Sequence, residues 1–129
     1  MPAPDARALA VRLAGKARSD ELVLDRLIDA PIVPDDVLGF HAQQAVEKLL
    51  KAALATVGGI PPRTHDLAHL TDLVAAAGLS PPAAAREARH LGPWAVEFRY
   101  GDPLDEVLDR EWARGVVSEV RAWIDALLA

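Results

Sequence analysis

The residues best able to do chemistry lie in short polar stretches of a chain that is otherwise rich in alanine and leucine. In one stretch, four polar residues recur at regular spacing: His41, Gln44, Lys48 and Lys51. They recur at steps of three, four and three residues, which places them on one face of a helix. Glu47 precedes Lys51 by four residues, the spacing of a helix-supporting ion pair. This face is either solvated or a polar wall that faces a groove or a second subunit.

A second polar stretch covers residues 62–69. His65 and His69 are four residues apart and would project from the same side of a helix, as metal ligands can. The stretch lacks a clear third ligand and the glutamate of a zinc protease motif, so we expect no metal site. In the purely structural interpretation, Thr64 is the N-cap of the helix and Asp66 interacts favourably with its dipole.

The same stretch has the residue types of a metal-independent ribonuclease. Five residues separate Arg63 from His69, which matches the loose R-x(4–6)-H spacing of some ribonucleases. An arginine can stabilise a pentavalent phosphate while a histidine transfers the proton. The spacing also arises by chance in any helical protein with several arginines and histidines.

A third polar element is Arg99-Tyr100, on a turn before Gly101-Asp102-Pro103. An arginine beside an aromatic residue can hold a phosphate and stack on a base. Alternatively, Asp102 caps the last helix and Arg99 pairs with a nearby carboxylate.

The elements that must position these residues are helices. Alanine and leucine favour helices, and no segment alternates apolar and polar residues as a half-buried strand would. Prolines and glycines divide the chain into helical segments. We expect helices over residues 5–29, 35–57, 64–77, and 82–98 with a break at Gly92-Pro93, and a last helix that opens at Asp102-Pro103 and includes Val107 and Leu108. The pattern predicts an all-α protein, one domain over residues 1–129, built as an antiparallel up-and-down bundle of four to five helices.

Composition excludes several functions. The chain of 129 residues has a formal net charge of −5, which argues against a cationic surface for long duplex nucleic acid. The absence of cysteine excludes disulfides, thiolate metal sites and a cysteine nucleophile. We find no apolar run long enough to span a membrane and no apolar core of a signal peptide after Met1. We therefore expect a cytoplasmic protein without a membrane partner.

The order of these motifs resembles a known family. Residues 40–52, Phe-His-Ala-Gln-Gln-Ala-Val-Glu-Lys-Leu-Leu-Lys-Ala, resemble the central helix of HEPN domains (higher eukaryotes and prokaryotes nucleotide-binding). Residues 64–67 are similar to the family's next motif, and Arg99-Tyr100 is similar to its later Arg-Tyr element. Residues 16–20 resemble the first-helix pattern, so the likeness covers nearly the whole chain.

The resemblance implies a HEPN-like bundle of four or five helices, commonly a homodimer and without a cofactor. Members are often encoded beside a small nucleotidyltransferase, in toxin–antitoxin or nucleotide-handling modules. Other branches are metal-independent ribonucleases with an R-x(4–6)-H motif on a later helix, whereas Arg63 and His69 lie at the start of the third helix here. The positions that match the family's recurring polar residues are His41, Gln44, Glu47, Lys48, His65, Asp66, Arg99 and Tyr100.

Three functions follow as hypotheses. The first is a binding module for a nucleotide or single-stranded RNA, with Lys48, His65 and Arg99 on the phosphate and Tyr100 stacked on the base. The second is a metal-independent endoribonuclease with His65 or His69 as general base and Arg63 or Arg99 stabilising the phosphorane. The third is a helical dimerisation domain whose polar residues fix register and partner choice. The sequence leaves open whether the protein is an enzyme.

Overall fold

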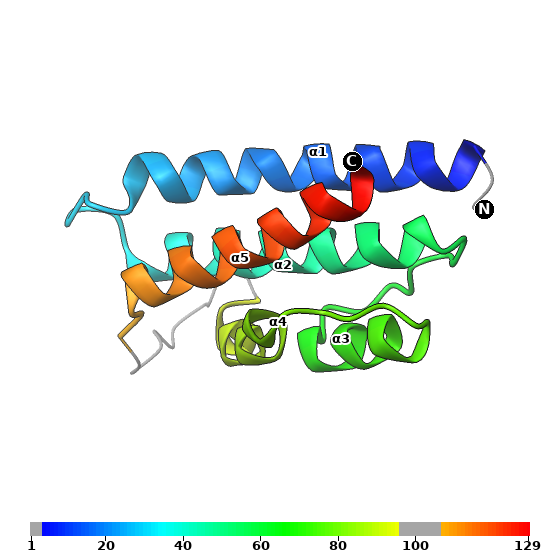
Figure 1. Ribbon diagram of the computed structural model, residues 1–129. Coiled ribbons are helices and arrows are strands. Elements are labelled where there is room, and N and C mark those ends of the chain that lie inside the picture. The colour runs from blue at the N-terminus through cyan, green and yellow to red at the C-terminus, as the bar shows by residue number, and fades with distance from the viewer. Residues whose placement is uncertain (1–3, 96–106) are drawn as a thin grey trace.

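A computed structural model describes residues 4–95 and 107–129, and every regular element within these ranges is a helix (Figure 1). The elements, in chain order, are α1 (Pro4–Leu27), α2 (Asp35–Thr56), α3 (Leu67–Ala76), α4 (Ala83–Glu87), the 3-10 helix η1 (Ala88–Trp94) and α5 (Arg110–Leu128). The prediction of an all-α helical bundle is confirmed. No helix in the described ranges has the length and hydropathy needed to cross a membrane.

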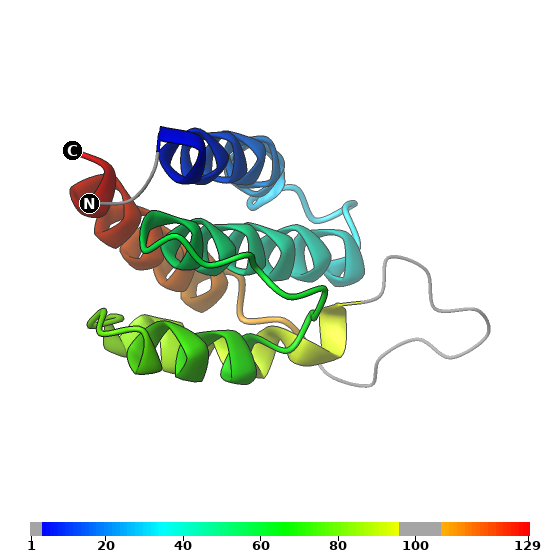
Figure 2. The same ribbon diagram turned by 90° about the vertical axis from the view of Figure 1, so that its right-hand side faces the viewer.

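Helix α2 is the centre of the bundle. It runs antiparallel to α1, and α5 crosses it obliquely, while α3, α4 and η1 form a layer on a third side (Figures 1 and 2). Most of α2 is therefore buried, and its apolar positions include Leu38, Ala42, Val46 and Leu49. These recur at the three- and four-residue steps of a helix that buries one broad face.

Small residues on α2 allow close packing, and Gly39 is the extreme case. A Cβ added at Gly39 would lie 2.3 Å from Cγ of Trp94 on η1. Carbon atoms in contact are normally about 3.5–4.0 Å apart. The buried indole of Trp94 therefore rests directly on the backbone of α2, and only glycine permits that approach.

A buried ion pair joins the first helix to the last. Arg121 on α5 donates from Nε to both carboxylate oxygens of Glu21 on α1 and from Nη2 to the carbonyl oxygen of Ala14, 2.7 Å away. Burial lowers the pKa of Arg121, but hydrogen bonds and charges of Glu21 and Asp125 outweigh it and raise the pKa above its ordinary value. Arg121 stays charged, and its charge is matched inside the structure.

Arg110, at the start of α5, fixes the connection between α1 and α2. Its guanidinium donates to Asp35 and to the carbonyl oxygens of Ile28, Ala30 and Val33. One planar group thus bonds to three carbonyls of the segment that connects α1 to α2.

Three expected boundaries are wrong. Asp66, not Thr64, is the N-cap of α3, because its carboxylate accepts from the backbone of His69, whereas Thr64 accepts from the N–H of Asp66. The last helix begins at Arg110, because Asp109 caps it and the N–H of Leu108 donates to Asp35 on α2 instead of joining a helix. The expected opening at residues 102–103 lies outside the described ranges.

The third correction concerns the segment expected as one helix over residues 82–98. It is helical from Ala83 to Glu87 and then continues as the 3-10 helix η1, with Pro93 inside it. Proline has no N–H and crowds the carbonyl four residues earlier, which disfavours α-helical geometry over that turn. The break therefore starts before Gly92-Pro93, at Ala88.

Candidate functional site

Four partly exposed polar residues of α2 recur at helical spacing and form a surface that we call the polar face of α2: His41, Gln44, Lys48 and Lys51. Figure 2 shows α1, α5 and the α3–α4 layer around α2, and none of these helices covers the remaining side, which faces away from α5. Asp20 on α1 contacts His41 and Lys48, and His65, in the segment before α3, contacts Glu47, so the polar face lies between α1 and that segment.

A buried carboxylate on α1 organises one end of the polar face. Asp20 accepts from Nδ1 of His41 at 2.8 Å and from Nζ of Lys48 at 2.6 Å. The Asp20 side chain is only 8% exposed, whereas the histidine and the lysine are about a quarter exposed. We call these three residues the Asp20 unit. One buried carboxylate thus holds both the imidazole of His41 and the ammonium group of Lys48, which remain partly exposed to solvent.

Asp20 was not among the predicted site residues, although the sequence holds a signal for it. It lies three residues after Ala17 and four before Leu24, on the buried apolar stripe of α1. A carboxylate on such a stripe needs a cationic or hydrogen-bonding partner on a facing helix, because an unpaired buried charge is costly. The facing helix could not be read from spacing alone.

A second carboxylate repeats this arrangement farther along α2. Glu47 accepts from Nδ1 of His65 at 2.7 Å and from Nζ of Lys51 at 3.2 Å, through different oxygens. The Glu47 side chain is 6% exposed, but His65 is 70% exposed. We call these three residues the Glu47 unit. The expected Glu47–Lys51 ion pair is therefore present, and it belongs to a larger group.

Gln43 supports the Glu47 unit from within the bundle. Its Nε2 lies 3.2 Å from Oε1 of Glu47 and 3.2 Å from the carbonyl oxygen of His65, and it donates to both. Its Oε1 accepts from Nε2 of Gln44 at 2.8 Å. Gln43 is completely buried and its polar atoms are all bonded, so it fixes both Glu47 and the segment that carries His65.

The hydrogen bonds define which groups are available to a ligand. A carboxylate only accepts, so Nδ1 of His41 and of His65 carries the proton, and in the neutral imidazole Nε2 is left as an acceptor. Each lysine uses one ammonium donor on its carboxylate and retains two. The polar face thus offers general bases and cationic donors side by side.

The other predicted residues lie elsewhere. Asp66 caps α3 and takes no part in either unit. Arg63 and His69 are exposed, and their side chains make no hydrogen bond or ion pair within the described ranges. Arg99 and Tyr100 lie outside those ranges. Among residues 4–95 and 107–129, no three histidine, aspartate or glutamate side chains are grouped so as to hold a metal ion.

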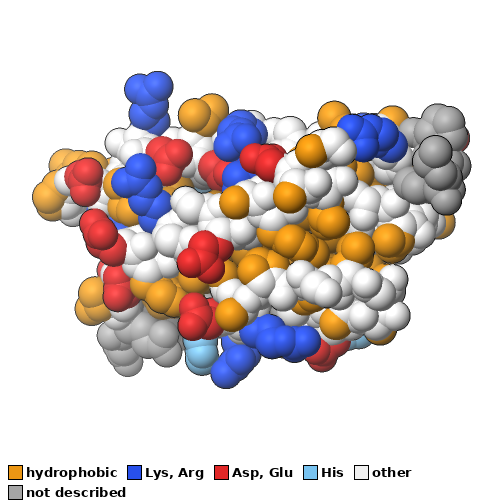
Figure 3. All heavy atoms as spheres, in the orientation of Figure 1, with side chains coloured by type: hydrophobic (Ala, Val, Ile, Leu, Met, Phe, Trp, Pro, Cys, Tyr) orange, Lys and Arg blue, Asp and Glu red, His pale blue; other side chains and the backbone are white. Residues whose placement is uncertain are grey.

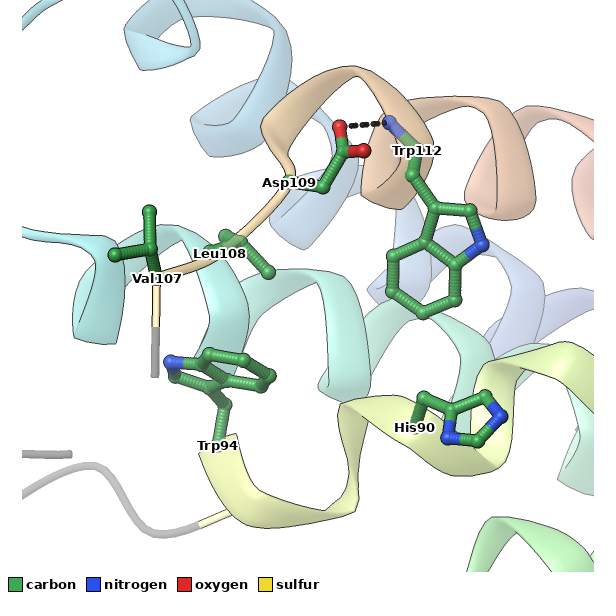
Figure 4. A pocket seen from close by; sticks show the side chains of 6 residues that line it. All are labelled: His90, Trp94, Val107, Leu108, Asp109 and Trp112. Carbon is green, nitrogen blue, oxygen red and sulfur yellow. Dashed lines mark hydrogen bonds between the residues drawn. The ribbon is translucent and has the colours of Figure 1, made fainter. Parts of the chain in front are cut away.

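A pocket of about 280 Å³ lies apart from the polar face, between η1 and the start of α5 (Figure 4). Its lining residues are His90, Trp94, Val107, Leu108, Asp109 and Trp112. The rings of His90 and Trp112 are 6.4 Å apart, and Nε1 of Trp94 is buried without a hydrogen-bond partner in the described structure. The pocket is mainly apolar and contains none of the predicted site residues.

The protein is an all-helical bundle whose central helix carries His41, Lys48 and Lys51 on one partly exposed face. The sequence profile of the HEPN domain matches residues 35–128, from the start of α2 almost to the end of α5. This chain belongs to the HEPN domain family. No curated protein and no solved structure shows significant similarity to it.

Proposed function

We propose that the protein binds the phosphate of a nucleotide or of single-stranded RNA at the polar face of α2. Membership of the HEPN family supports a role with nucleotides or RNA in general. The observation that carries the proposal is the Asp20 unit, where a buried carboxylate holds Lys48 and His41 at the surface. Gln44 lies between them on the same face, and His65 is nearby through Glu47.

The chemistry of the polar face suits a phosphate. The free ammonium donors of Lys48 can make charge-assisted hydrogen bonds, which are shorter and stronger than neutral ones. Because Asp20 already fixes the lysine, little side-chain entropy is lost when a ligand binds. The acidic net charge of the whole chain favours a small ligand or a single strand over a long duplex. Arg99 and Tyr100 remain part of the proposal, as phosphate and base contacts.

Calorimetric titration with AMP and with a short single-stranded RNA tests the binding proposal. Lys48→Gln keeps a donor for Asp20 but removes the charge, so we expect affinity to fall by about ten- to a hundredfold. The chain has three lysines, and the exposed Lys16 on α1 supplies the matched control Lys16→Gln. Equal affinity in the Lys48 variant and the wild type would contradict the proposal.

The binding unit we propose is a homodimer, working with a small nucleotidyltransferase in a toxin–antitoxin-type module. Apolar side chains form a band between the C-terminal half of α5 and the α3–α4 layer (Figure 3), and α5 carries the partly buried Trp123 and Leu127. Exposed apolar patches are typical of protein–protein interfaces. The nucleotidyltransferase is proposed as a partner because members of this family are often encoded beside one. Sedimentation of the purified chain, alone and mixed with the product of a neighbouring nucleotidyltransferase gene, checks both partners.

A second candidate function, metal-independent endoribonuclease, is favoured by one observation. His65 is held by a buried carboxylate through Nδ1, while its side chain is 70% exposed and its Nε2 makes no hydrogen bond within the described part of the chain. This is the geometry in which a carboxylate fixes the tautomer and orientation of a general base. Arg63 lies two residues away in sequence and would stabilise the phosphorane.

Cleavage of labelled single-stranded RNA in excess EDTA tests this candidate. We expect His65→Ala to abolish cleavage and His69→Ala, in a histidine without a carboxylate partner in the described structure, to leave it intact. RNA that stays intact with the wild-type protein excludes the endoribonuclease. If neither binding nor cleavage occurs, the remaining hypothesis is a helical dimerisation domain.

A further inference from the structure

We infer that the polar face of α2 takes ligands with two neighbouring phosphoryl groups, one at the Asp20 unit and one at the Glu47 unit. The inference rests on the proposed phosphate binding and names the class of ligand. Its basis is the repetition of one arrangement, in which a buried carboxylate accepts from an imidazole Nδ1 through one oxygen and from a lysine Nζ through the other.

The ammonium groups of Lys48 and Lys51 come from neighbouring positions on α2 but are held by different carboxylates. Lys48 and Lys51 are three residues apart on α2, so their Cβ atoms are about 5–6 Å apart on one side of the helix. Asp20 draws Lys48 toward α1, and Glu47 draws Lys51 toward the segment that carries His65. The ammonium groups are therefore held on opposite flanks of the face. This arrangement fits two adjacent anionic groups better than one.

The net charge of each unit also favours ligands with two phosphoryl groups over ligands with one. With neutral imidazoles, each lysine is balanced by its own carboxylate, so a single phosphoryl group meets a unit with no net charge. One such contact is weak. When one phosphoryl group of a ligand is bound at one unit, a second group on the same ligand is held close to the other unit at a high effective concentration. The two contacts together therefore give a higher affinity than either contact alone. The polar face therefore discriminates by the number of phosphoryl groups.

Two kinds of ligand have this chemistry: the polyphosphate chain of a nucleoside diphosphate, and adjacent phosphates in a single strand. Calorimetric titration compares AMP with ADP and with the dinucleotide pApA. We expect at least one of the two larger ligands to bind about tenfold or more tightly than AMP. Whichever binds more tightly identifies the source of the second phosphoryl group.

Lys51→Gln is the decisive variant, because glutamine still donates to Glu47 but has no charge. It should lower the affinity for the preferred larger ligand much more than the affinity for AMP, so that the ratio between the two affinities is lost. Lys16→Gln is the control, and thermal denaturation verifies that each variant is folded. His65→Asn tests the same unit from its other side if Lys51→Gln does not fold.

The outcomes separate this inference from the proposed function. If AMP, ADP and pApA bind equally well, or if Lys51→Gln keeps the preference for the larger ligand, the two-group inference is wrong while phosphate binding stands. If none of the three ligands binds, the proposed phosphate site itself is wrong.

Discussion

Replacing Gly39 with alanine tests how η1 packs on the central helix. The new Cβ would lie 2.3, 2.5 and 2.8 Å from Cγ, Cδ1 and Cβ of Trp94. Since contacting carbons are about 3.5–4.0 Å apart, Trp94 or α2 must move by about 1 Å. The clash involves the stem of a side chain that is 4% exposed, so a simple rotation of the ring cannot relieve it.

The size of the effect follows from two opposing terms. Overpacking a core costs about 1–3 kcal/mol, and a clash at the stem of a buried tryptophan belongs at the upper end. Alanine gains about 1 kcal/mol over glycine inside a helix. We therefore expect Gly39→Ala to lower the free energy of unfolding by about 2 kcal/mol. For a protein of this length that corresponds to a fall in Tm of about 6–10 °C.

Gly15→Ala is the matched control, because Gly15 is an exposed helical glycine on α1 with no other atoms within 4 Å of an added Cβ. It should raise stability by up to about 1 kcal/mol through helix propensity alone. Thermal and urea denaturation followed by circular dichroism measures both variants. If Gly39→Ala is as stable as the wild type, or more stable, the packing of Trp94 against α2 is wrong.

Two further predictions concern arginines that join distant elements. Arg121→Met leaves the buried Glu21 with only the more exposed Arg18 as a cation and should cost about 3 kcal/mol in urea denaturation. Glu21→Leu combined with Arg121→Met should recover most of that loss. The pKa of Arg121 is raised in the folded state, so its contribution to the free energy of unfolding is complete at any pH below the ordinary pKa of arginine and is lost only above the folded pKa. A contribution of Arg121 to stability that changes between about pH 6 and 9 would contradict this. Arg110→Lys cannot reach the carbonyls of Ile28, Ala30 and Val33 together and should cost about 2 kcal/mol, while Arg114→Lys, in a half-exposed pair with Asp25, should change stability by less than about 1 kcal/mol.

The features that could be predicted from the sequence are those that depend on residues close to one another in the same helix. The steps between His41, Gln44, Lys48 and Lys51 gave the polar face, and the Glu47–Lys51 pair followed from four-residue spacing. The helical bundle followed from amphipathic segments and the prolines and glycines between them. These features are local, so one sequence is enough to predict them.

Contacts between helices were not predicted, because they depend on how one helix is placed against another. Spacing within α2 could not reveal that Asp20 on α1 lies between His41 and Lys48, nor that Gln43 faces inward to hold His65. Residue type alone does not distinguish the N-cap of α3, because Thr64 and Asp66 are both good capping residues. The start of α5 was missed because Asp35, far away in the sequence, accepts from Leu108 and Arg110.

The ion pair between Glu21 and Arg121 also bears on the order in which the chain folds. Its partners are a hundred residues apart, and Arg7 near one end donates to the carbonyl of Leu128 near the other. During synthesis α1 and α2 emerge first and can pair through a short connection, whereas long-range contacts wait for closure of a large loop. Until α5 docks, Glu21 has only the more exposed Arg18 of its own helix as a cationic partner and stays in contact with solvent. We therefore expect α5 to dock last, so that the bundle closes only after α5 has been synthesised.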